Sequence, residues 1–186
     1  NFNEKVWRTL YFYVMIFLWE RLPLKSSKQK DGGIYVSKKY PGGLQSHLGL
    51  DCDLEKKELP YERFCDIYTR QAQDKHYYCL VCEEEGTVVA VMNLRMEDQL
   101  HHAETIAEIL EFSVADAYRS RGVGKDIFAI GCQIAKDWGC TQMEAASNQL
   151  RTDAHRFYLR EEMNNFHYKF SKRLDGENST VNVLGR

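Results

Sequence analysis

The stretch of residues 107–125 limits the fold of this chain more than any other part of the sequence. Residues 106–114 form a mostly apolar run that is typical of a buried strand. Residues 115–121 are polar and suit a turn, and a helix is predicted from residue 122 to about residue 138. A buried strand that passes directly into an amphipathic helix indicates an α/β domain.

Two glycines and three basic residues surround the start of that helix: Arg119, Arg121, Gly122, Gly124 and Lys125. Glycine lets a ligand approach the backbone closely, and the first N–H groups of a helix have no intrahelical partner. The helix dipole adds positive potential at the same place. The pattern therefore predicts a phosphate or pyrophosphate site. The alternative is an ordinary junction between strand and helix with solvated arginines.

The loop is neither of the two common nucleotide-binding loops. A P-loop requires Ser or Thr after its lysine, but Asp126 follows Lys125. A dinucleotide fingerprint requires a third glycine, where this chain has Ile127. Residues 119–124 instead read R-x-x-G-x-G, which resembles the pyrophosphate loop of the GNAT superfamily of acyl-CoA-dependent N-acyltransferases.

A second motif supports the same resemblance. Residues 151–158, RTDAHRFY, are similar to the R-x-x-A-x-x-F-Y helix of small-molecule N-acetyltransferases in that superfamily. The chain departs from the usual continuation, because Glu162 replaces a glycine and Met163 replaces the closing aromatic residue. The two motifs together imply the small-molecule branch of the family.

Periodicity and turn residues predict an ordered series of elements along the rest of the chain. The predicted strands cover residues 33–37, 77–83, 87–94, 106–114, 141–146 and 166–174, and the predicted helices cover 44–58, 60–73, 122–138 and 151–162. This order indicates a mixed sheet with helices packed against it. The resemblance implies a mostly antiparallel sheet in which a splayed parallel pair of strands forms the CoA cleft.

The resemblance also implies acetyl-CoA as the cosubstrate and assigns residues to it. Backbone groups of Phe112, Ser113 and Val114 would pair with the pantetheine arm as an added strand would. Backbone N–H groups would hold the pyrophosphate, and they belong to Arg121, Gly122, Val123, Gly124 and Lys125. Asn148 would line the cofactor cleft, and Tyr158 would lie near the thioester sulfur.

Amine acetylation needs a base, because an alkylamine resembles lysine, with a pKa near ~10.4, and is protonated at neutral pH. Glu108 and Glu111 on the central strand are the candidates, and a carboxylate on an apolar strand has a raised pKa that suits a base. Their spacing of three predicts opposite faces of the sheet, so only one faces the substrate. A structural ion pair is the alternative role for either residue, and a water chain or His102 is the alternative base.

Tyr158 is the predicted general acid for the thiolate leaving group, with packing of its ring in the core as the alternative. A strand N–H near Val114 would stabilise the oxyanion. Attack is expected to be direct, in a ternary complex, because no cysteine is paired with a histidine in the manner of a nucleophile. The catalytic candidates are therefore Tyr158, Glu108 and Glu111.

Composition limits the setting in which this chemistry takes place. The 186 residues suit one domain, with a predicted apolar segment and linker at 1–32, the acetyltransferase domain at 33–174 and a polar tail at 175–186. The net charge of −2 does not favour nucleic acid. Six cysteines without framework spacing indicate reduced thiols and a cytoplasmic protein. The apolar run at residues 10–19 is short for a bilayer span, so we expect no membrane role, and a homodimer stays open.

The expected function is transfer of the acetyl group from acetyl-CoA to a primary amine of a small molecule. Two alternatives stay open, an N-acetyltransferase of proteins or peptides and a CoA-binding module without turnover. Adjacent His101 and His102 raise the question of a metal, but the sequence offers no third ligand, and we expect none.

Overall fold

The computed structural model describes residues 33–37 and 43–175 of the chain. These residues form two compact units, one ending at Ala145 and the other beginning at Ala146, and each is described by itself. The predicted N-terminal segment and all but one residue of the predicted tail lie outside the described residues. Among the described residues, no helix has both the length and the apolar character that crossing a bilayer requires.

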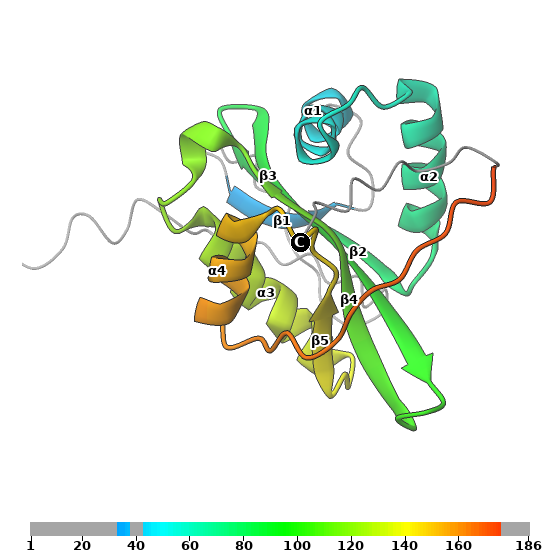
Figure 1. Cartoon of the computed structure of the whole chain (residues 1–186). Coiled ribbons are helices and arrows are strands. Elements are labelled where there is room, and N and C mark those ends of the chain that lie inside the picture. Colours follow the sequence, from blue (N-terminus) through cyan, green and yellow to red (C-terminus); the bar gives the residue numbers. More distant parts are fainter. Residues whose placement is uncertain (1–32, 38–42, 176–186) are drawn as a thin grey trace, which may run out of the picture. The chain divides into compact units, whose positions relative to one another are not determined.

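The first unit contains a series of strands and helices that follows the predicted order (Figure 1). Its strands are β1 (Gly33–Ser37), β2 (Tyr77–Glu84), β3 (Thr87–Gln99), β4 (Glu104–Val114) and β5 (Gln142–Ala145). Its helices are α1 (Leu44–Glu55), α2 (Tyr61–Gln73), the 3-10 turn η1 (Asp116–Tyr118) and α3 (Val123–Asp137). The largest difference from the prediction is β3, which extends to Gln99 and makes a long hairpin with β4.

The five strands form one sheet in the order β1-β2-β3-β4-β5. The first three pairings are antiparallel, whereas β4 and β5 are parallel. The predicted mixed and mostly antiparallel sheet is therefore confirmed. The parallel pair separates early, because β5 pairs only with Ile106–Ile109 while β4 continues to Val114. On that side, no strand described in the first unit covers the edge of β4 from Leu110 to Val114.

One face of the sheet is apolar and carries α3 (Figure 1). Leu80, Met92 and Leu94 are fully buried there, and all three lie close to Gly131 of the helix. A Cβ atom at Gly131 would come within 2.8 Å of the Met92 sulfur, so the absence of a side chain lets the helix approach the sheet.

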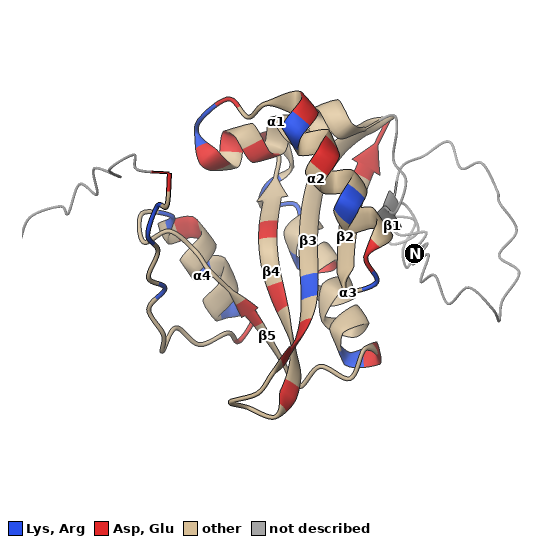
Figure 2. Cartoon of the chain, turned by 90° about the vertical axis from the view of Figure 1, so that its right-hand side faces the viewer, with Lys and Arg blue, Asp and Glu red and all other residues tan. Residues whose placement is uncertain are grey.

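The opposite face is mixed in character and lies beneath α1. Its apolar part is a cluster of Leu50 from the helix with Val81, Val88 and Val91 from the sheet. Its polar part follows the cross-strand row Cys79, Asn93 and Glu111. Figure 2 shows the charge on this part of the sheet, with acidic bands along β4 beside a basic band on β3.

A β-bulge in β4 corrects the prediction that Glu108 and Glu111 face opposite sides. Glu111 is paired with Asn93, and Glu108 is paired with Arg95. Two residues separate the glutamates but only one separates their partners, so Leu110 is an extra residue without a paired residue on β3. Asn93 and Arg95 are two apart on a regular strand and share a face. Both glutamates therefore lie on the α1 side of the sheet, because the extra residue breaks the alternation on which the prediction relied.

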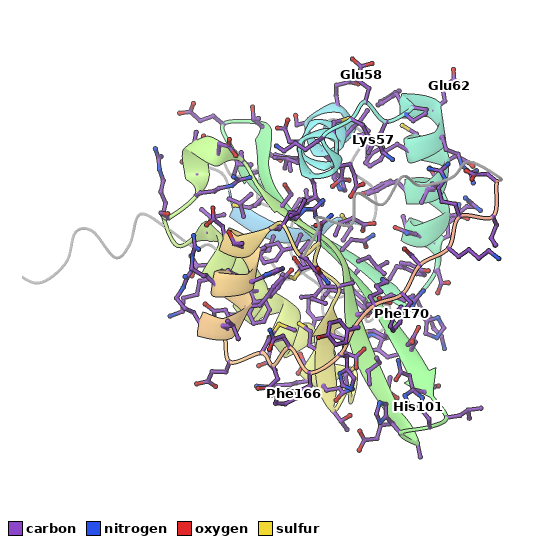
Figure 3. The ribbon with its side chains drawn as sticks, in the orientation of Figure 1. Lys57, Glu58, Glu62, His101, Phe166 and Phe170 are labelled. Carbon is purple, nitrogen blue, oxygen red and sulfur yellow. The ribbon has the colours of Figure 1, made fainter. Side chains whose placement is uncertain are left out.

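The second unit contains α4 (Thr152–Arg160), which confirms the predicted helix with slightly shorter bounds. The predicted strand at 166–174 is wrong, since those residues have no regular structure. Phe166 and Phe170, on the extended segment labelled in Figure 3, are 80% and 90% exposed. The alternating aromatic residues fit a strand pattern, but a strand also needs a hydrogen-bonding partner, which the segment does not have within this unit.

Candidate functional site

The loop between β4 and α3 has an irregular backbone. Ser120 and Gly122 both have a positive φ, of 60° and 91°. Gly122 is also the N-cap residue of α3, and no side chain caps the first turn of the helix. Alternating backbone handedness turns successive N–H groups toward one point, which makes an anion site. This backbone is compatible with the pyrophosphate site predicted at Arg121 to Lys125, which stays a prediction.

The basic side chains of the loop have different roles. Arg119 turns back onto the end of β4, where its Nε donates to the Val114 carbonyl oxygen at 3.0 Å. It also forms an ion pair with Asp116 at 2.8 Å, so its charge serves to fix the turn. Arg121 lies over the ring of Tyr118, 5.4 Å from its centroid. Lys125 is exposed in the first turn of α3.

The residues predicted to pair with pantetheine lie on the uncovered edge of β4. Phe112 and Val114 pair with Met92 and Ala90 on the β3 side, which leaves the other edge of the strand uncovered within the first unit. The buried Ser113 hydroxyl donates to the Leu50 carbonyl oxygen at 3.3 Å and so ties this edge to α1. This contact fixes the position of the strand edge, and the pairing of an extended ligand with it stays a prediction.

The two glutamates differ in their partners. Glu108 forms an ion pair with Arg95 at 2.6 Å, and the same guanidinium nitrogen contacts Glu97 at 2.6 Å. Glu111 instead accepts a hydrogen bond from Asn93 Nδ2 at 2.8 Å. Burial raises the pKa of the Glu111 carboxyl, and the hydrogen bond from Asn93 only partly opposes this. A carboxyl group with a raised pKa and no guanidinium partner is better suited to accept a proton than one held in an ion pair.

The residues that hold Glu111 were not predicted from the sequence. Asn93 donates from the same Nδ2 to Gln71 Oε1 of α2, at 2.9 Å. The sequence did contain a signal, because Asn93 is a single amide within the apolar run of β3. In the structure this residue is only 7% exposed. A buried polar residue on a central strand needs partners, and these partners place α2 over the site.

The second unit holds the two remaining predicted residues. Burial raises the pKa of the Tyr158 phenol to about 12, so the phenol stays protonated at neutral pH. Asn148 is exposed and forms the turn before α4, where its Oδ1 accepts from the Leu150 N–H at 2.9 Å. Its backbone oxygen accepts from Arg151 N–H, also at 2.9 Å. The side-chain oxygen of Asn148 thus has a local structural partner.

The paired histidines lie apart from this arrangement. His101 is at the tip of the β3–β4 hairpin (Figure 3), and its ring centroid is 4.0 Å from that of His102. Both side chains are exposed, and within the described residues no three His, Cys, Asp or Glu side chains are grouped as metal ligands.

Comparison with known proteins identifies the family to which this fold and loop belong. Residues 45–163 match the acetyltransferase (GNAT) family. Over 129 residues the chain is 36% identical to the aminoalkylphosphonate N-acetyltransferase of Salmonella typhimurium strain LT2, covering 69% of this chain and 84% of that relative. The chain therefore belongs to the GNAT acetyltransferase family, as the motifs predicted, and it is an acetyltransferase.

Solved structures support the same fold. An acetyltransferase of Trypanosoma brucei has a TM-score of 0.64 at 20% identity, covering 77% of this chain and 100% of its own. The aminoglycoside N-acetyltransferase AAC(6')-Iy, solved in complex with CoA, has a TM-score of 0.66 at 14% identity, covering 76% of this chain and 95% of its own.

Proposed function

We propose that this protein transfers the acetyl group of acetyl-CoA to a primary amine of a small molecule by direct attack in a ternary complex. One observation supports this most strongly: Glu111, a carboxyl with a raised pKa, lies where β4 parts from β5, on the strand that leads into the anion-binding loop. The base, the uncovered strand edge and the proposed anion site then follow one another in that order between residues 110 and 125.

The chain offers a suitable group for each part of the cosubstrate. The N–H groups of the loop before α3 fit a pyrophosphate, and the uncovered edge of β4 fits an extended amide-bearing arm. Acetyl-CoA would supply the acetyl group as an activated thioester. A strand N–H near Val114 donates to the carbonyl oxygen as negative charge develops on it.

Glu111 accepts a proton from the ammonium group, which leaves the neutral amine that attacks the thioester carbonyl carbon. The nitrogen loses its second proton as the carbon–sulfur bond breaks, and that proton neutralises the departing thiolate. A base is most effective when its pKa is near the working pH, and burial moves the pKa of Glu111 in that direction. Tyr158 donates a hydrogen bond to the leaving sulfur. Its pKa of about 12 lies above the ~8.5 of a thiol, so the phenol keeps its proton and stabilises the thiolate without full transfer.

The named relative suggests the first substrates to test. An aminoalkylphosphonate is a small primary amine, and the relative shares 36% identity over 69% of this chain. We propose that aminoalkylphosphonates belong to the acceptor class of this protein. Peptides and proteins form the competing acceptor class.

The test is release of free thiol from acetyl-CoA in the presence of an amine panel. The panel contains aminoalkylphosphonates, polyamines, amino acids, aminoglycosides and short peptides, and the Tyr158→Phe variant is assayed beside the wild type. We expect thiol release with a small amine and slower release in the variant. Release with peptides alone would favour a peptide acetyltransferase. No release, while CoA still raises the melting temperature, would contradict the proposal and favour a binding module.

A further inference from the structure

A buried pair of titratable side chains lies on the inner side of α1. His47 and Asp51 are one helical turn apart and are only 6% and 7% exposed. His47 Nε2 lies 3.3 Å from Asp51 Oδ2. Two aromatic rings of α2 pack edge-on against the imidazole, Phe64 at 5.0 Å and Tyr68 at 6.2 Å between centroids. A carboxylate is rarely buried so deeply unless its oxygens have partners.

The pair borders the hydrogen-bonded group around Glu111. The negative charge of Asp51 contributes to the raised pKa of Glu111, although burial is the larger cause. Asp51 has the same effect on Cys79, whose pKa is raised chiefly by burial. Geometry places this part of α1 over the same face, because Leu50, next to Asp51, packs against Val91 and accepts from Ser113. The row of Cys79, Asn93 and Glu111 is the next one along that face of the sheet.

Two oxygens in this buried region lack donors. Asp51 Oδ1 and Asn93 Oδ1 are fully buried and accept no hydrogen bond from the described residues. The Asn93 amide group is held in place, because its Nδ2 already donates to both Gln71 and Glu111. Its oxygen is therefore fixed as an acceptor. Buried acceptors of this kind normally have partners, and two in one place indicate a ligand with several donors.

The charge of the region favours a cation. The basic side chains of this region already have acidic partners: Arg95 is paired with Glu108 and Glu97. His47 lies against Asp51, so Glu111 has no ion-pair partner among the described residues. An ammonium group carries three N–H donors and no acceptor. Asp51 Oδ1, Asn93 Oδ1 and the Glu111 carboxylate offer acceptors for those three donors.

We infer that Asp51, Asn93 and Glu111 form the subsite for the ammonium group of the acceptor, in which Asp51 and Asn93 bind the group and Glu111 removes its proton. The inference rests on the proposed acetyl transfer and adds the residues that select a charged amine. Asp51 is then a substrate-binding residue, and His47 is a positioning residue that orients its carboxylate.

The test compares Asp51→Asn with Asp53→Asn, which makes the same substitution on the exposed side of α1. The probe is 2-aminoethylphosphonate, assayed by thiol release and by calorimetric binding to the enzyme saturated with CoA. Loss of one charged hydrogen-bond acceptor should raise the KM and the Kd for the amine about tenfold to a hundredfold. The KM for acetyl-CoA should not change, and Asp53→Asn should match the wild type.

A second measurement does not depend on the stability of the variant. Wild-type enzyme should bind 2-hydroxyethylphosphonate, which lacks the ammonium group, at least about tenfold more weakly than the amine. Equal binding of the two compounds, or an unchanged KM for the amine in a folded Asp51→Asn variant, would overturn the inference while leaving acetyl transfer intact. Absence of thiol release by the wild type with every amine would instead refute the proposed function.

Discussion

Glu111 and Glu108 lie on the same face of β4, but Glu108 is paired with the cationic Arg95, whereas Glu111 accepts a hydrogen bond from the neutral Asn93. We expect Glu111→Gln, which keeps a group able to accept from Asn93, to lower kcat about 10²-fold or more, as loss of a general base does. A base works in its ionised form, and burial raises the pKa of Glu111. Wild-type kcat should therefore fall as the pH drops through a value above the ordinary pKa of glutamate.

The pH profile of kcat at saturating amine measures this effect. The acidic limb should be absent from Glu111→Gln and present in Glu108→Gln, which changes a carboxylate already paired with Arg95. If Glu108→Gln removes the limb and Glu111→Gln keeps it, the roles proposed for the two residues are reversed.

Glu162 has a backbone conformation that normally favours glycine. Its φ is +64°, and it follows the C-cap residue of α4, at the position where the family motif that residues 151–158 resemble continues with glycine. A left-handed conformation costs a residue with a side chain roughly 1–2 kcal/mol, part of which the greater freedom of glycine in the unfolded chain offsets.

We therefore predict that Glu162→Gly raises the free energy of unfolding by about 0.5–1 kcal/mol. Urea denaturation monitored by circular dichroism measures the change. The control is Glu161→Gly, since Glu161 has a φ of −87° and should lose stability on substitution. A loss of stability in both variants would mean that the backbone of Glu162 is not strained.

At the scale of the element, the loop from β4 to α3 depends on the backbone of Gly122. A Cβ there would meet only Asp126 Oδ2, at 3.9 Å, so substitution would not cause a clash. The φ of 91° is the obstacle, because a residue with a side chain avoids this conformation. Gly122→Ala should therefore disturb the direction of the N–H groups more than the packing.

We expect Gly122→Ala to weaken CoA binding about tenfold or more, measured by calorimetry, since the strain amounts to roughly 1–2 kcal/mol. Gly49→Ala is the matched control. Gly49 is an exposed position within α1 with no atom within 4 Å of an added Cβ. That change should leave CoA binding unaltered and stabilise the helix by about 0.5–1 kcal/mol.

The elements themselves were largely predictable from local sequence, because apolar periodicity and turn residues act over a few positions. The helix start at Pro60, the turn at Gly86 and the loop at Gly122 all fall where their chemistry predicted. The bulge at Leu110 was not predictable, since it arises from how β3 and β4 match in register. The same holds for 166–174, where an alternating pattern exists but the described residues of the second unit offer no partner strand.

Only the part of the candidate site that lies on one continuous segment could be predicted, because sequence patterns are local. Its loop is one continuous segment, so the motif revealed it. Asp51, Asn93 and Gln71 come from α1, β3 and α2, and no local pattern in the sequence connects these positions. The spacing of His47 and Asp51 was visible in the sequence, but only the fold shows that both side chains are buried.

At the scale of the whole molecule, direct attack requires both substrates on the enzyme at once. We predict intersecting lines in double-reciprocal plots and no acetylated protein, by mass spectrometry, after incubation with acetyl-CoA alone. Burial raises the pKa of the Cys79 thiol and raises that of Cys82 to about 11, so neither provides a thiolate nucleophile at neutral pH. Parallel lines together with an acetyl adduct would contradict direct attack.

The extra residue at Leu110 has a consequence for protein engineering. β4 leads directly into the loop before α3, and the bulge adds local twist to the strand before that loop. Ile109 pairs with Leu94 and Glu111 pairs with Asn93, so deleting Leu110 would restore regular alternation and leave every later side chain on its present face. A graft of residues 115–125 onto a regular strand would therefore keep its direction if that strand ends in the same register, and the transferable unit is the loop together with that register.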